Sequence, residues 1–153
     1  MILEIIQKGT QSLFVYQDGQ LLFYSVLKFN WINRIINIYN QNDDLFLELK
    51  CRSFFMKSNY QILFQNQSLT PFINEINSRT ITFNNDKHLT VNQKHFISFN
   101  YNYYFRDTKI AELKKKIFST SFKMILDIND ENLEFSNQII MHILSIETGV
   151  SVD

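Results

Sequence analysis

The sequence has little cysteine, proline or glycine, and the shortage of cysteine and glycine excludes several kinds of protein. Cys51 is the one cysteine among 153 residues, so no disulfide can form within the chain, and we expect a small buried side chain at this position. Three glycines are present, and neither a Gly-rich phosphate loop nor a nucleophile elbow can be found. We therefore expect a protein that is not an enzyme.

Net charge and long apolar runs are lacking as well. Fifteen basic and fifteen acidic residues give a formal net charge of zero, whereas affinity for nucleic acid comes mainly from neutralised phosphates. No run of about eighteen apolar residues could span a membrane, and the first residues have neither the basic leader nor the cleavage site of a secretory signal. We expect a cytoplasmic protein with no nucleic-acid partner and no transmembrane segment.

The histidines do not form a metal-binding pattern. His88, His95 and His142 are scattered, and none has the spacing of metal ligands with a second histidine or with Cys51. We expect no metal and no cofactor. For His142, which falls in an apolar segment, we expect a hydrogen-bond partner in the surrounding protein.

What the sequence does contain is a series of short strand patterns, spaced roughly 8–12 residues apart as in all-β barrels and sandwiches. Apolar and polar residues alternate in several of them, which is typical of strands with one buried face. Asp18-Gly19 predicts a two-residue hairpin turn. There is no linker and no internal repeat, so one domain is predicted over 1–153. The predicted strands cover residues 2–7, 12–17, 20–27, 32–39, 45–50, 60–64, 72–76, 80–83, 89–91, 96–105, 109–117 and 121–128.

The segment after the last strand, residues 132–147, reads as a helix that is apolar on nearly every side. A helix without a polar face must be enclosed, and an all-β protein encloses one most simply by closing its sheet around it. An amphipathic helix lying across an open sheet is the alternative. We expect a mainly β fold, a closed antiparallel barrel of roughly twelve strands around a hydrophobic C-terminal helix, with Asp130 as N-cap and Gly149 after the last turn.

This order of parts resembles the tubby C-terminal-like superfamily, which includes tubby proteins, LURP-one-related proteins and phospholipid scramblases. The resemblance covers nearly the whole chain: the hairpin over 16–24, the strand-rich middle, the closing strands over 110–118 and 122–128, and the apolar helix. It implies a twelve-stranded barrel threaded by its C-terminal helix. For some members it implies phosphoinositide binding through basic side chains on the barrel surface. We expect neither the membrane-anchoring tail nor the acylated cysteines of scramblases.

Basic residues gather in one place. Residues 109–123 hold five lysines and one glutamate, whereas residues 127–153 hold six acidic residues and no basic one. Each basic group near an anionic membrane contributes about 1 kcal/mol, which makes four lysines candidate lipid-binding residues: Lys109, Lys114, Lys116 and Lys123. The period of a strand places Lys114 and Lys116 on one face. Lysines that protect an edge strand from aggregation would give the same pattern.

Phe29 and Trp31 are candidate contacts for a membrane or a partner, because an aromatic side chain in a loop can insert into an apolar surface; packing at the rim of the core is the competing role. The leading hypothesis is a non-enzymatic cytoplasmic module, peripheral to the membrane, that binds anionic phospholipid or a protein partner through its outer surface. A protein-interaction or scaffold domain without lipid affinity is the alternative, and it predicts an exposed apolar patch.

Overall fold

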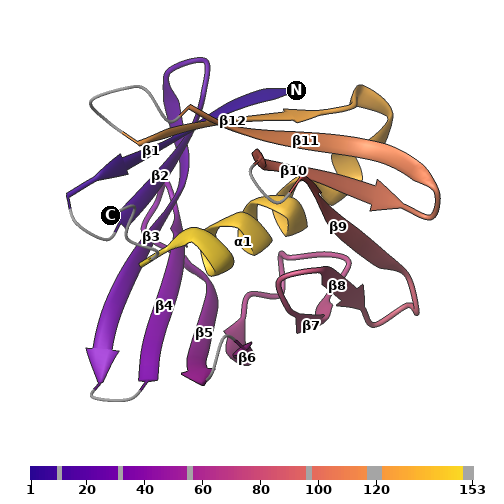
Figure 1. Cartoon of the computed structure of the whole chain (residues 1–153). Coiled ribbons are helices and arrows are strands. Elements are labelled where there is room, and N and C mark those ends of the chain that lie inside the picture. The colour runs from indigo at the N-terminus through magenta and orange to yellow at the C-terminus, as the bar shows by residue number, and fades with distance from the viewer. Residues whose placement is uncertain (10–11, 31–32, 55–56, 96–97, 117–121, 150–153) are drawn as a thin grey trace.

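The computed structural model describes residues 1–9, 12–30, 33–54, 57–95, 98–116 and 122–149, and in this part of the chain twelve antiparallel strands surround a C-terminal helix (Figure 1). The predicted fold class is confirmed. The strands are β1 (Ile2–Lys8), β2 (Ser12–Gln17), β3 (Gln20–Asn30), β4 (Asn33–Asn40), β5 (Leu45–Phe54), β6 (Lys57–Gln65), β7 (Ile73–Ile76), β8 (Thr80–Phe83), β9 (His88–His95), β10 (Ser98–Phe105), β11 (Thr108–Lys116) and β12 (Lys123–Ile128).

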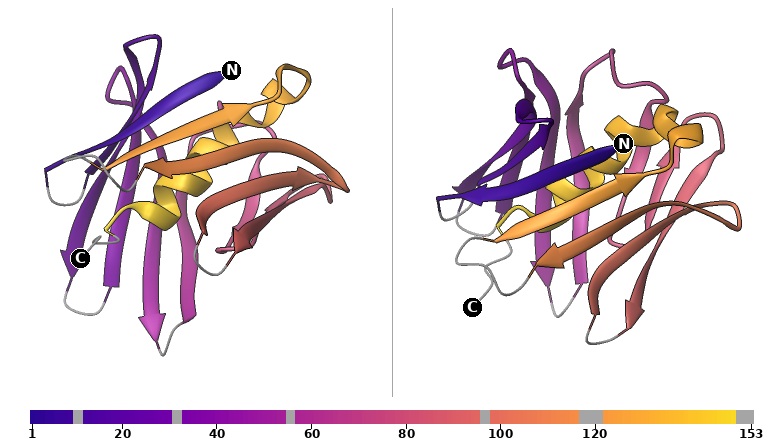
Figure 2. Two further views of the ribbon diagram at one scale, coloured as in Figure 1. Left: turned by 45° about the horizontal axis from the view of Figure 1, so that its top comes forward. Right: turned by 90° about the horizontal axis from the view of Figure 1, so that it is seen from above.

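The sheet is built from two runs of hairpins joined through the first and last strands. Its order is β6-β5-β4-β3-β2-β1-β12-β11-β10-β9-β8-β7, so every neighbour is also a neighbour in sequence except at the β1–β12 pair. There Leu3 lies opposite Leu126 and Ile5 opposite Met124. Figure 2 shows β1 beside β12, which brings the N-terminus of the chain against the strand that leads into the helix.

The barrel is nearly closed, and its two edge strands meet without a backbone ladder. Within the described residues no backbone hydrogen bond joins β6 to β7. The Gln65 side chain makes the link instead, because its amide donates to the Ile73 carbonyl at 2.9 Å and its oxygen accepts from the Ile73 amide at 2.7 Å. One side chain therefore takes the place of a strand partner at this seam.

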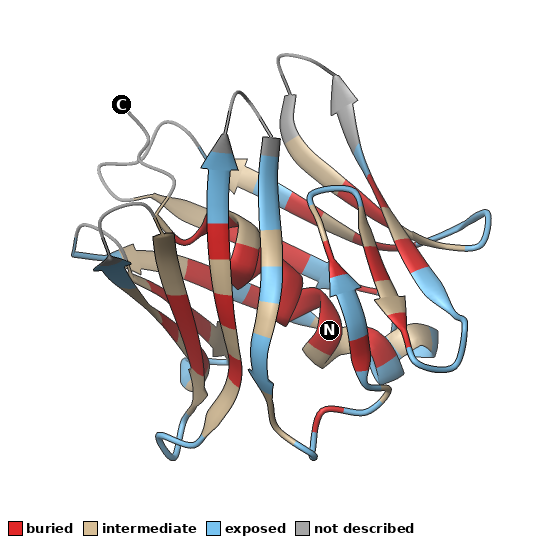
Figure 3. Ribbon diagram, turned by 90° about the horizontal axis from the view of Figure 1, so that it is seen from below, coloured by how far each residue is buried: buried red, intermediate tan, exposed pale blue. Residues whose placement is uncertain are grey.

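The helix α1 (Ser136–Glu147) lies inside the barrel, and every residue from Gln138 to Ser145 is buried. In Figure 3 the helix in the middle of the view is largely buried behind the strands. The inward side chains of the strands, such as Leu3, Ile5 and Val15, are also fully buried. Each such apolar side chain contributes about 1.5–3 kcal/mol when it is removed from water. The enclosed helix is confirmed, and the helix on an open sheet is excluded.

Hydrogen bonds fix how the helix is rotated within the barrel. His142 contacts the Tyr103 hydroxyl through Nδ1 and the Asn77 carbonyl through Nε2, both at 2.9 Å. Gln138 donates to the Pro71 carbonyl at 3.0 Å. The predicted partner of His142 is confirmed, and these bonds oppose rotation because a turned helix would leave buried polar atoms unpaired.

Two predicted helix boundaries have different outcomes. The segment η1 (Asp130–Phe135) is a 3-10 helix with Asn129 at its N-cap position, so the prediction of Asp130 as cap is wrong. The Asp130 carboxylate instead accepts from the N-terminal ammonium of Met1 at 3.1 Å, a partner that local sequence does not reveal. Gly149 follows the helix with φ +79°, as predicted.

Two strand predictions also have different outcomes. The Asp18-Gly19 turn is confirmed, because both residues have positive φ, at 49° and 78°. The predicted gap between the fifth and sixth strands is too long, since β5 continues to Phe54 and β6 begins at Lys57. The extra residues pair with one another, with Ser53 opposite Ser58, and this pairing extends both strands beyond their apolar stretch.

His142 predicts a specific loss of stability in acid. Burial lowers the pKa of His142 from 6.5 to about 4, because the imidazolium would lose its hydration. The unfolded chain therefore binds a proton that the folded chain does not as the pH falls from 6.5 towards 4, so folding is weakened in this range and not above it. Between pH 7 and pH 4.5 we expect the free energy of unfolding, measured with urea, to fall by about 2 kcal/mol more in the wild type than in His142→Gln. Equal losses in the two proteins would contradict a neutral, buried His142.

Candidate functional site

Strand β11 divides the lysine run between the two faces of the barrel wall. Ala111 and Leu113 are buried, Lys115 follows them on the inner face, and Lys114 and Lys116 are exposed. This alternation follows from the period of a strand. Because β11 pairs with both β10 and β12, it is not an edge strand, and protection of a free edge does not explain its lysines.

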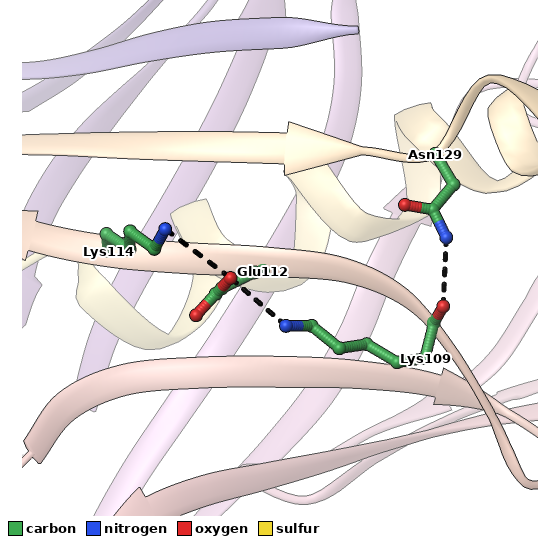
Figure 4. A network of polar contacts seen from close by, with 4 residues as sticks. All are labelled: Lys109, Glu112, Lys114 and Asn129. Carbon is green, nitrogen blue, oxygen red and sulfur yellow. Dashed lines mark hydrogen bonds and ion pairs between the residues drawn. The ribbon is translucent and has the colours of Figure 1, made fainter.

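On the outer face, two of the candidate lysines share one carboxylate (Figure 4). Glu112 Oε2 lies 3.0 Å from Lys109 Nζ and 3.6 Å from Lys114 Nζ. The hydrogen bond from Lys109 is the main reason why the pKa of Glu112 is lowered. Asn129 donates to the Lys109 carbonyl at 2.9 Å, which ties the end of β12 to the start of β11. Glu112 therefore compensates part of the positive charge of this surface.

The other two candidate lysines lie next to each other on neighbouring strands. Lys116 of β11 lies opposite Lys123 of β12. Lys123 forms an ion pair with Glu4 at 3.1 Å, whereas Lys116 is exposed and has no ion pair within the described residues. Of the four candidate lysines, Lys116 and Lys114, whose side chain is 61% exposed, are thus the most available to an external anion.

The strand register continues this pair of lysines into a line of apolar and aromatic side chains. Lys123 lies opposite Ile6, Ile6 opposite Phe14, Phe14 opposite Tyr24 and Tyr24 opposite Tyr39. The four apolar and aromatic residues are half-buried, and each comes directly after a buried residue of its strand. We call this set across six neighbouring strands the outer row: Lys116, Lys123, Ile6, Phe14, Tyr24 and Tyr39.

The aromatic half of the outer row is a stacked ladder. The Phe14 and Tyr24 rings lie 5.7 Å apart at 13°, and the Tyr24 and Tyr39 rings lie 5.3 Å apart at 22°. Lys8 Nζ lies 5.2 Å from the Phe14 centroid and 4.9 Å from that of Tyr16. The Tyr24 hydroxyl donates to Asp43 at 2.7 Å, which raises the pKa of Tyr24 to about 12. The stacked rings and the lysines thus lie along one continuous row on the outer face.

Sequence reasoning missed the aromatic ladder, although part of its signal is present. Phe14 and Tyr16 alternate with the buried Leu13 and Val15, so the period of two already places both rings on the outer face. The stacking of Phe14 on Tyr24, and of Tyr24 on Tyr39, depends on pairing across three strands, which local alternation does not specify.

Of the two predicted aromatic contacts, Phe29 belongs to the described residues and Trp31 does not. Phe29, on β3, is 66% exposed. Other exposed apolar side chains lie on and near β6, at the seam of the barrel: Leu63, Phe64 and Phe72. The apolar surface is therefore not confined to the turn where it was expected.

Inside the barrel, Lys115 forms an enclosed ion pair with Glu147, the last residue of α1. Lys115 Nζ lies 2.7 Å from Glu147 Oε2, and the two side chains are 9% and 5% exposed. Burial, followed by the nearby Glu147, raises the pKa of Tyr101 to about 12. A cavity of about 10 Å³ beside Tyr101 and Glu147 has room for about one water molecule. This cluster is too tightly filled to hold a small-molecule substrate, and we interpret it as the anchor of the helix end.

The described residues contain no group of three or more His, Cys, Asp or Glu side chains that could hold a metal ion. In the same residues, neither α1 nor η1 has the length and apolar character that crossing a bilayer requires. The outer row combines exposed lysines with stacked aromatic rings, and we take it as the candidate site of binding.

The Lys115–Glu147 pair predicts a large difference between neighbouring lysines. Lys115→Met should lower the free energy of unfolding by about 3–5 kcal/mol, because it leaves the enclosed Glu147 without its opposite charge. Lys115→Met combined with Glu147→Gln should regain most of this loss. Lys114→Met, on the outer face, should change stability by about 1 kcal/mol or less. Urea unfolding at pH 7 gives the free energy of unfolding of the wild type and of the three variants. Equal effects of the substitutions at positions 114 and 115 would show that Lys115 is not enclosed.

Comparison of this chain with family models, with curated proteins and with solved structures gives no match. The resemblance to the tubby C-terminal-like superfamily therefore depends on the order and character of the elements alone.

Proposed function

We propose that this chain is a non-enzymatic module that binds anionic phospholipid at a membrane surface through the outer row. The observation that carries the proposal is the direct continuation of two paired lysines, Lys116 and Lys123, into the ladder of Phe14, Tyr24 and Tyr39. As a second part of the proposal, the chain is a distant member of the tubby C-terminal-like superfamily.

The two halves of the outer row suit the two parts of a membrane interface. Lysines are attracted to anionic headgroups, and each contributes about 1 kcal/mol near such a surface. Tyrosine side chains are favoured at the level of the headgroups because each ring has an apolar body and a polar end. Since strands are spaced about 4.8 Å apart, a row over six strands extends roughly 24 Å, enough to contact several headgroups at once.

The acidic partners of the lysines determine the expected strength of binding. Glu112 lies between Lys109 and Lys114, and Glu4 pairs with Lys123. An anionic headgroup must compete with these carboxylates, so we expect weak binding that decreases as salt screens the exposed charges. The aromatic rings are not screened in this way and should supply the part of the affinity that remains.

Sedimentation with vesicles of phosphatidylserine and phosphatidylcholine tests this function. We expect the wild type to bind at low salt and to bind less at high salt. Lys116→Glu in the outer row, combined with Lys114→Glu beside it on the same exposed face of β11, should weaken binding at low salt at least about 30-fold, because two favourable contributions of about 1 kcal/mol each are lost. Phe14→Ser should weaken the binding that persists at high salt.

A matched control changes the same charge elsewhere. Arg79→Glu with Lys87→Glu alters two exposed basic residues outside the outer row, and it should leave vesicle binding close to that of the wild type. Thermal unfolding of each variant checks that the barrel is intact. No binding by the wild type at low salt, or equal losses in the two double variants, would overturn the proposal and favour a protein-interaction domain without lipid affinity.

A further inference from the structure

Strand β6 is an edge of the sheet, and its one charged residue is the first, Lys57, so the usual protection is lacking from Ser58 onwards. It has nine residues, whereas β7 across the seam has four. Natural edge strands are commonly protected by charged side chains, by proline or by bulges that turn the edge away. The sequence from Ser58 to Gln65 contains no charged residue, no proline and no glycine. The bulge in this strand lies at Leu63, close to the hydrogen bonds between the Gln65 side chain and Ile73, which we call the Gln65 clasp. The stretch from Ser58 to Ile62 is therefore regular and unprotected.

The side chains of β6 show that this edge is open to water. Tyr60 and Ile62 point inwards, opposite Cys51 and Leu49 of β5. Both are only half-buried, whereas Cys51 and Leu49 are 1% and 0% exposed. None of the residues from Ser58 to Gln65 is buried, and Figure 3 views the molecule from the side on which β6 and β7 lie. In the described part of the chain, β7 meets β6 at Gln65 but has only four residues, so the edge of β6 from Ser58 to Ile62 has no strand hydrogen-bonded to it and is open to water.

The backbone of this stretch has one partner strand where an interior strand has two. Within the described residues, Ser58 to Ile62 pair with β5 alone, and no other backbone hydrogen bond reaches them. The free N–H and C=O groups are directional donors and acceptors, and the ligand that satisfies a row of them is another extended strand.

We propose that β6 pairs with β6 of a second copy of this chain, antiparallel and about a two-fold axis near Tyr60, so that the two barrels form a dimer through a shared sheet. A stretch without charge is compatible with itself, because no like charges face each other across the axis. The formal net charge of zero means that long-range repulsion does not oppose the approach of two copies. An isologous contact of this kind also closes on itself and does not lead to a fibre.

The geometry sets the strength and the register of the contact. Pairing over Ser58 to Ile62 covers little area, and interfaces below about 1,000 Å² are usually transient. The dimer should therefore dissociate on dilution. With the axis near Tyr60, Asn59 of one copy lies opposite Gln61 of the other, and both residues are exposed on the outer face.

Analytical ultracentrifugation without lipid, over a series of concentrations, tests the dimer. The wild type should change from monomer to dimer as concentration rises. Asn59→Lys with Gln61→Lys should stay monomeric, because like charges would meet at both ends of the pairing and an edge lysine opposes strand addition. The control variant Gln20→Lys with Asn42→Lys adds the same charge at exposed positions elsewhere and should dimerise as the wild type does.

Hydrogen exchange of the wild type gives a test that does not depend on any variant folding. Amides within Ser58 to Ile62 should exchange more slowly as protein concentration rises, while amides of β7 should not change. A wild type that stays monomeric at every concentration overturns the proposal and leaves an extended segment of another protein as the partner that suits this edge. A dimer that the β6 variant does not weaken, or protection that is independent of concentration, also overturns it.

Discussion

The structure depends on the enclosure of α1, an apolar helix without a polar face that could be exposed to solvent. Residues Gln138 to Ser145 are buried, so α1 is stable only if strands surround it. The wall that does this comes from two runs of hairpins, which are joined where β1 pairs with β12. Once the inner face of each strand is committed to the helix, the outer face is the one left for interactions with other molecules.

Polar groups inside the barrel set the position of the helix, and the apolar core holds it there. His142 bonds to Tyr103 and Asn77 at the middle of α1, and Glu147 bonds to Lys115 at its end. A shift of the helix by one residue would leave these groups buried without partners, at a cost of about 1–3 kcal/mol for each neutral group. The ion pair of Lys115 also fixes the face that β11 turns outwards, so its neighbours Lys114 and Lys116 are held on the outer face.

Local pattern was enough to predict most of the fold. Strand-like stretches spaced roughly 8–12 residues apart, several of them with a period of two, located all twelve strands within a few residues at their ends. The Asp18-Gly19 turn identified a hairpin, and the apolar segment over 132–147 implied a closed barrel. The same period placed Lys114 and Lys116 on one face, as the structure has them.

The sequence pattern could not predict the contacts that depend on pairing or folding of the whole chain. These are the aromatic ladder, the Glu112 carboxylate shared by two lysines, the Asp130 contact with Met1, and the Gln65 clasp at the seam. Pairing across the sheet decides these contacts, and pairing is a property of the whole fold.

Native-state hydrogen exchange of the helix amides tests the enclosure most directly. If α1 is surrounded by the barrel, amides from Gln138 to Ser145 can exchange only when the whole domain unfolds, so their free energy of opening and its dependence on urea should equal those of global unfolding. Opening of these amides at a clearly lower free energy, with little dependence on urea, would mean that the helix can leave the strands while they stay folded. That result would contradict a barrel built around its helix.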